Sequence, residues 1–119
     1  VWGYSNDDCH SLPYHLGLGW NTVYVTDPSA AGVVESLRQG RFYTSTGVEI
    51  TGISVSGDTI RIETSNARRI VALLDSGRRF EIADGGTIEV EYPEAATYVR
   101  FECWGDGEQF AWTQPFWQA

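Results

Sequence analysis

Hydrophobic and polar residues alternate along most of the chain beyond residue 42. A period of two is typical of half-buried β-strands. Alternating runs at residues 53–55 and 60–62 lie on either side of Gly57-Asp58. Two such runs joined by a short turn containing glycine and aspartate predict a β-hairpin.

Further strand patterns follow this hairpin, and turn residues separate them. They cover residues 69–75, 80–82, 88–92 and 97–104, and the aromatic segment 110–117 follows. Val99, Phe101 and Cys103 lie on one side of their strand, which predicts that they face a core. Short strands at this spacing predict a mainly β fold, namely an immunoglobulin-like antiparallel β-sandwich.

The first forty residues have a different pattern. The aromatic run at residues 2–4 is strand-like, and residues 20–26 are rich in β-branched and aromatic types, so we expect a short strand-loop-strand-helix segment. Because alternation begins at about Phe42, we place a boundary there. The predicted parts are residues 1–41 and the sandwich domain, residues 42–119.

A helix is expected directly after the strand at residues 20–26. Asp27 is a good N-cap, and Pro28 suits the first helical position. Apolar residues at 30, 33, 34 and 37 form one stripe at helical spacing. Gly40 is the expected residue beyond the C-terminus of the helix.

Charge and length exclude several classes of function. The chain has 119 residues, too few for a complete barrel enzyme, and a formal charge of −8. Its acidic surface would repel a phosphate backbone, so we expect no nucleic-acid partner. The longest apolar run, residues 70–74, is far too short to span a bilayer, and no signal peptide is visible. We therefore expect no membrane association and favour a cytoplasmic location.

The residues with metal-ligand character lie near the N-terminus, in Asp7-Asp8-Cys9-His10 and at His15. If residues 2–8 form a strand that continues, Asp8 and His10 project to the same side and can share a divalent cation. A carboxylate and an imidazole suit zinc, manganese or iron. Asp8 and His10 are the principal candidates, and Asp7 and His15 are weaker ones.

Three motifs extend this interpretation: Asn6-Asp7-Asp8-Cys9-His10, Gly19-Trp20-Asn21-Thr22-Val23, and the run from Leu37 to Gly47. In this order they resemble the C-terminal end of the polymerase-and-histidinol-phosphatase (PHP) family, as does Ala-Trp-Thr-Gln-Pro at residues 111–115. In that family an Asp-x-His motif closes a barrel, and many members carry a β-sandwich after it. The family hydrolyses phosphoesters at a cluster of divalent metals. The resemblance implies that Asp8 and His10 are metal ligands and that residues 1–41 derive from a barrel end.

The chain departs from the family in its missing ligands. No His-x-His pair or further set of histidines is present. Two ligands do not hold a reactive metal firmly enough to activate water. We therefore expect a fragment that is inactive alone and assign no catalytic residue. Ser45 and Thr46 are expected to belong to a turn, because neither histidine is placed by sequence to activate them.

Two other functions stay open. Exposed aromatic rings can stack on sugars, and Trp104, Trp112 and Trp117 are the candidates for a carbohydrate-binding surface. Alternatively, the surface left by the missing barrel mediates self-association as a homodimer. That surface would include four aromatic residues, Trp2, Tyr4, Trp20 and Tyr24.

Overall fold

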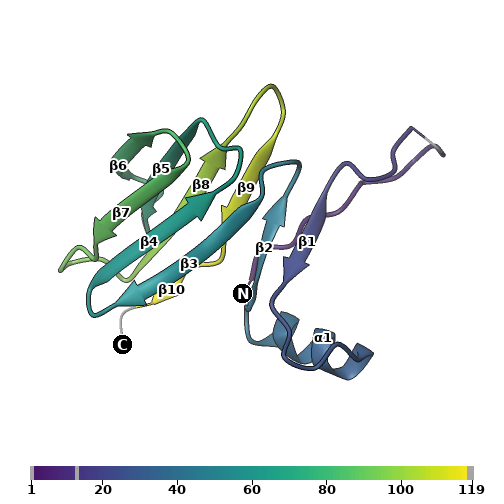
Figure 1. Ribbon diagram of the computed structural model, residues 1–119, viewed down its shortest axis with the longest axis horizontal. Coiled ribbons are helices and arrows are strands. Elements are labelled where there is room, and N and C mark those ends of the chain that lie inside the picture. Colours follow the sequence, from purple (N-terminus) through teal and green to yellow (C-terminus); the bar gives the residue numbers. More distant parts are fainter. Residues whose placement is uncertain (1, 13, 118–119) are drawn as a thin grey trace.

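A computed structural model describes residues 2–12 and 14–117. Val1 of the predicted N-terminal part and residues 118–119 of the predicted sandwich domain lie outside the described residues, as does Pro13. The described chain forms two antiparallel sheets and one short helix, and no barrel. The prediction of a mainly β fold is therefore confirmed. Figure 1 shows the elements in chain order.

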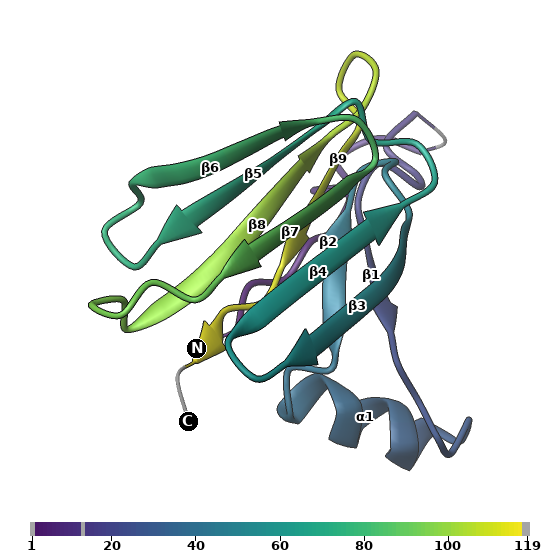
Figure 2. The same ribbon diagram turned by 60° about the vertical axis from the view of Figure 1, so that its left-hand side comes forward.

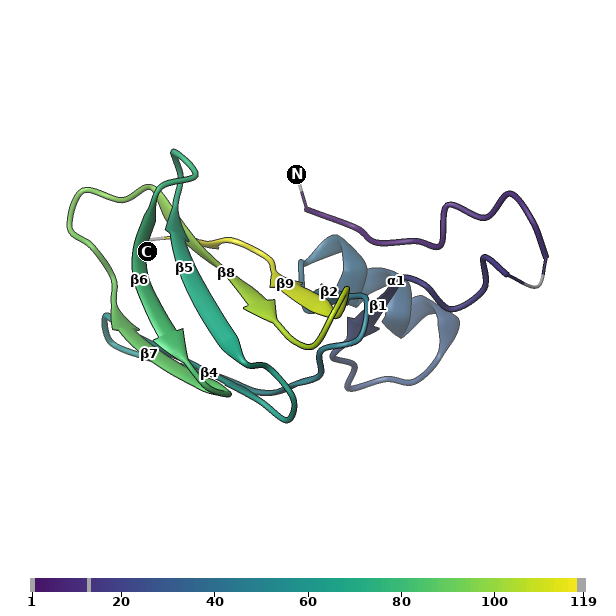
Figure 3. The same ribbon diagram turned by 90° about the horizontal axis from the view of Figure 1, so that it is seen from above.

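The larger sheet has seven strands in the order β1-β2-β9-β8-β5-β6, and β10 also pairs with β8. Its strands are β1 (Trp20–Val23), β2 (Phe42–Ser45), β5 (Arg69–Leu74), β6 (Arg79–Asp84), β8 (Tyr98–Trp104), β9 (Phe110–Thr113) and β10 (Phe116–Trp117). The smaller sheet has the order β3-β4-β7 and contains β3 (Ile50–Ser56), β4 (Thr59–Thr64) and β7 (Thr87–Glu91). Seen from above, the two sheets form separate layers (Figure 3).

The predicted hairpin and the later strands are confirmed. Ser56 pairs with Thr59 across Gly57-Asp58, so β3 and β4 are joined by the expected two-residue turn. The turn at residues 84–86 does more than reverse the chain. Because β6 pairs with β5 and β7 pairs with β4, it carries the chain from the larger sheet to the smaller one.

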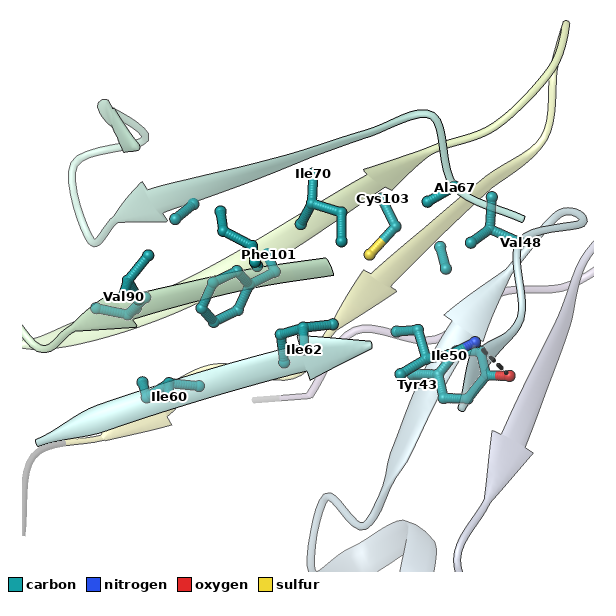
Figure 4. Close-up of a cluster of buried hydrophobic side chains, with 14 of the residues drawn as sticks. Tyr43, Val48, Ile50, Ile60, Ile62, Ala67, Ile70, Val90, Phe101 and Cys103 are labelled. Carbon is teal, nitrogen blue, oxygen red and sulfur yellow. Dashed lines mark hydrogen bonds between the residues drawn. The ribbon is translucent and has the colours of Figure 1, made fainter. Parts of the chain in front are cut away.

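The hydrophobic core lies between the two sheets (Figure 4). As predicted, Val99, Phe101 and Cys103 are fully buried on one side of β8. Four residues of the smaller sheet are buried opposite the larger sheet: Ile60, Ile62, Ile88 and Val90. The backbone N–H of Ile50 donates a hydrogen bond of 3.2 Å to the Tyr43 hydroxyl, which satisfies a polar group at the edge of the core.

The helix α1 spans Ala30–Arg38 and lies at the end of the β1–β2 pair (Figure 2). Its N-cap is Ser29, not Asp27 as predicted, because the Ser29 hydroxyl accepts the Gly32 N–H. Asp27 instead accepts hydrogen bonds from the backbone N–H and the hydroxyl of Ser29. Gly40 ends the helix as expected, with φ of 72°. The N–H of Arg41 bonds to the carbonyl of Ser36, which completes a Schellman motif.

The strand β1 lies beside β2 in the larger sheet. Four residue pairs, from Trp20 with Ser45 to Val23 with Phe42, set their antiparallel register. All four residues of β2 are buried, because β2 has neighbours on both sides and Tyr4 stacks on Phe42 at 4.9 Å between ring centroids. The division between residues 41 and 42 stays a prediction.

Candidate functional site

Residues 2–9 carry no strand, so the expectation of a strand over residues 2–8 is wrong. Two side-chain carboxamides form hydrogen bonds with the backbone of this segment. They take the place of the backbone groups that a neighbouring strand would offer. The Gln114 carboxamide accepts from the Gly3 N–H (2.9 Å) and donates to the Gly3 carbonyl (2.6 Å). The Asn21 carboxamide bonds in the same way to Ser5, at 2.9 Å for both contacts. Backbone polar groups are thus satisfied without a sheet ladder.

Beyond Ser5 the chain forms a projecting arm, whose described residues are 6–12 and 14–19, and the arm folds back to β1 (Figures 1 and 3). The Asp7 carboxylate organises the returning half of the arm. It accepts hydrogen bonds from the backbone N–H groups of Gly17 (2.9 Å), Leu18 (2.6 Å) and Gly19 (3.0 Å). The bonds from Gly19 and Gly17 hold the pKa of Asp7 below its usual value. Asp7 is therefore committed to shaping the arm.

His15 is also engaged within the arm. Its Nδ1 accepts hydrogen bonds from the backbone N–H groups of His10 (3.0 Å) and Ser11 (3.1 Å). A neutral imidazole that accepts at Nδ1 carries its proton on Nε2. In this arrangement His15 has no further lone pair to give to a metal. Its ring lies edge-on to the His10 ring, at 6.1 Å between centroids.

Asp8 and His10, the two principal metal candidates, are both exposed on the arm. Within the described residues, neither the Asp8 carboxylate nor the His10 ring makes a hydrogen bond; the Asp8 backbone N–H donates to Asn6 Oδ1 at 2.8 Å. Asp8 has a positive φ of 49°, an uncommon conformation that aspartate tolerates better than most residues. Because residues 2–9 form no strand, the two-residue spacing no longer places these side chains on the same side.

A complete metal centre is not formed by this part of the protein. Across residues 2–12 and 14–117, no group of three or more His, Cys, Asp or Glu side chains lies together in a metal-binding arrangement. A firmly held catalytic ion needs at least three protein ligands, so the role of Asp8 and His10 as metal ligands stays a prediction.

Ser45 and Thr46 have structural roles. Ser45 is the last residue of β2 and not a turn residue as expected, whereas Thr46 lies in the bend that follows the strand. The buried Ser45 hydroxyl donates to the Val48 carbonyl (2.7 Å) and accepts the Gly47 N–H (2.9 Å). The Thr46 hydroxyl donates to the Glu108 carbonyl and accepts the Phe110 N–H. The Ser45 hydroxyl also lies 3.2 Å from the Phe110 carbonyl, so both hydroxyls tie this segment to the β8–β9 hairpin.

The three tryptophans proposed for stacking all lie on the outer face of the larger sheet, away from the core. On β8, Trp104 alternates with the buried Phe101 and Cys103 and pairs with Phe110 of β9. Trp112 stacks on Phe110, with centroids 5.6 Å apart and ring planes at 23°. Trp117 of β10 is opposite Tyr98, with ring centroids 4.9 Å apart.

A hollow of about 470 Å³ lies on this outer face, between the N-terminal segment and strands β8 and β9. Its lining comprises Gly3, Tyr4, Ser5, Thr44, Arg100, Trp112, Thr113, Gln114 and Pro115. Of the three tryptophans, only Trp112 contributes. Arg100, which lines the hollow, was not among the predicted site residues, although its alternation with Val99 and Phe101 placed it on the polar side of β8.

Exposed apolar side chains are concentrated in the N-terminal part. Among the described residues, twelve large hydrophobic side chains are exposed, and eight of them lie between residues 4 and 34: Tyr4, Leu12, Tyr14, Leu16, Leu18, Trp20, Tyr24 and Val34. Three of the four aromatics predicted for an interaction surface are in this set. Trp2 is not, because it packs against Gly40 and donates from Nε1 to the Arg38 carbonyl.

Comparisons with protein families, curated proteins and solved structures gave no match for this chain. None of the helices in the described residues is long and apolar enough to cross a bilayer.

Proposed function

We propose that this chain supplies Asp8 and His10 to the metal centre of a PHP-type phosphoesterase, and that its two sheets are the immunoglobulin-like β-sandwich appended to that enzyme. The observation that carries the proposal is the difference between neighbouring side chains in the arm. Asp7 and His15 accept hydrogen bonds that hold the arm, whereas the side chains of Asp8 and His10 are exposed and make no hydrogen bond within the described residues.

The donor set suits zinc, manganese or iron. Asp8 would bind through a carboxylate oxygen and His10 through a ring nitrogen. A bound divalent ion supplies Lewis acidity and lowers the pKa of coordinated water, which is the chemistry that phosphoester hydrolysis needs. Because Asp8 and His10 are only two ligands, the other ligands and the substrate contacts must come from residues outside this chain.

The eight exposed apolar side chains between residues 4 and 34 support the proposal that the N-terminal part packs against another domain or chain. Patches of this kind normally contact another domain or chain. In the proposed enzyme the partner is the barrel, which would bring its own ligands close to Asp8 and His10.

Without a barrel, we expect this surface and the open edge of β1 to pair with a second copy of the chain. Trp20 and Tyr24, at 41% and 68% exposure, lie on or directly after this edge strand. An unpaired strand edge with exposed aromatic residues is a template for further pairing. Sedimentation equilibrium should show a dimer that weakens when Tyr24 is replaced by lysine, and a monomer at high concentration would contradict self-association.

Metal binding should depend on Asp8 and not on Asp7. We expect Asp8→Asn to weaken zinc binding roughly tenfold, because it removes an anionic ligand. Asp7→Asn, a matched change one residue away, should retain most of the binding. It should instead accelerate amide hydrogen exchange at Gly17 and Gly19, whose N–H groups lose a charged acceptor. Calorimetric zinc titration and hydrogen exchange measure the two effects.

Equal zinc affinity in the protein and its Asp8→Asn variant would contradict the assignment. An aryl phosphate assay adds a second check on the proposal. The chain alone should show at most trace hydrolysis, so a metal-dependent rate abolished by His10→Ala would overturn the statement that the site is incomplete.

A further inference from the structure

The hollow on the outer face of the larger sheet lies on the opposite side of β8 from the core and does not include Asp8 or His10. Its volume of about 470 Å³ is in the range of small-molecule sites. We propose that this hollow binds one ring of a neutral saccharide, with Trp112 as the stacking surface.

The Trp112 indole stacks on a second ring. Phe110 stacks on Trp112, yet Phe110 does not line the hollow. Phe110 therefore restricts the indole rotamers and leaves the rest of the Trp112 surface available to the hollow. A fixed aromatic face buries the apolar C–H face of a sugar ring at little cost in side-chain entropy.

The polar groups around the Trp112 indole suit a ligand that carries hydroxyl groups better than they suit an anionic ligand. Arg100 Nη1 is 3.1 Å from a carboxylate oxygen of Glu102, so its positive charge is already paired. Arg100 keeps other N–H donors, and the Ser5 and Thr44 hydroxyls also line the hollow. The chain carries a net charge of −8, which disfavours a phosphate, sulfate or carboxylate ligand.

The opposite wall of the hollow is fixed before any ligand binds. It is the segment Gly3–Ser5, which the carboxamides of Gln114 and Asn21 hold through paired hydrogen bonds. The Tyr4 ring is stacked on Phe42. A preformed wall lowers the entropic cost of binding.

Trp112→Ala should weaken saccharide binding roughly tenfold, because the stacking surface is lost. The probes are neutral tetrasaccharides built from glucose, mannose, galactose or xylose, each added at about 10 mM. In the unaltered protein, binding is followed by the shift of the Trp112 indole N–H signal, and in all variants it is followed by saturation transfer to the sugar protons. Trp117→Ala is the matched control, because Trp117 is exposed on the same face and does not line the hollow. It should bind as the unaltered protein does.

Trp112→Phe keeps an aromatic ring on Phe110, so it tests the site even if the alanine variant does not fold. It should bind more weakly than the unaltered protein and more strongly than an Arg100→Met, Trp112→Phe double variant.

The absence of an indole shift with every neutral probe would overturn the proposal. An equal loss of binding in the Trp117→Ala control, or stronger binding of a sulfated tetrasaccharide, would also overturn it. Because Asp8 and His10 are unchanged in these variants, zinc binding should persist, so failure here is distinguishable from failure of the proposed metal function.

Discussion

Replacing Phe101 with alanine is expected to lower the free energy of unfolding by about 3–5 kcal/mol. Phe101 has no exposed surface and lies on the central part of β8, where its ring meets Phe116 edge-on at 5.8 Å between centroids. Strands on both sides of β8 and the smaller sheet above it restrict collapse around the vacated space. The loss therefore includes a cavity term as well as the transfer of the ring to water.

Urea unfolding followed by circular dichroism measures this loss. Tyr14→Ala is a matched truncation of an aromatic side chain that is 80% exposed, and it should change stability by no more than about 0.5 kcal/mol. Similar values for the two variants would show that β8 is not the centre of the core.

Gly40→Ala should cost about 2–5 kcal/mol, for two separate reasons. Gly40 has φ of +72°, which a residue with a side chain adopts at a penalty. A Cβ atom there would also lie 2.7 Å from the Trp2 indole. The indole has little freedom to move, because its Nε1 donates to the Arg38 carbonyl at 2.9 Å and the next residue, Gly3, is bonded to Gln114.

The Gly77→Ala variant separates the cost of the positive φ from the cost of the contact with Trp2. Gly77 has φ of +77°, and a Cβ atom there would meet nothing within 4 Å. This variant should therefore lose only the conformational part, about 1–2 kcal/mol. Adding Trp2→Ala to Gly40→Ala should cost less than the two single changes together. Equal losses for Gly40→Ala and Gly77→Ala would contradict the contact between Trp2 and the helix end.

Several strands were predictable from the sequence because buried and more exposed residues alternate along them, as in β4, β7, β8 and β9. Val99, Phe101 and Cys103 illustrate this, since each is buried between half-exposed neighbours. The helix start was harder, because Asp27 and Ser29 are both good capping residues. The sequence does not show that the Asp27 carboxylate would bind Ser29 and leave the Ser29 hydroxyl to cap the helix.

The N-terminal segment was not predictable from local pattern. Residues 2–4 look like a strand, yet what lies beside them is a pair of carboxamides, one from Gln114, 111 residues from Gly3. The hollow has the same origin, since Gly3, Tyr4 and Ser5 of this segment form part of its lining. For the candidate metal ligands, the residue types indicated that carboxylate and imidazole groups are available. Only the three N–H groups on Asp7 and the two on His15 distinguish those residues from Asp8 and His10.

The most direct test of the proposed metal role is to locate a bound ion by paramagnetic broadening. Small amounts of Mn²⁺ should broaden the amide signals of Asp8 and His10 first, and the Asp8→Asn variant should lose this effect. Broadening that is spread over the acidic surface, or is centred on exposed carboxylates such as Asp84 and Glu89, would contradict the account.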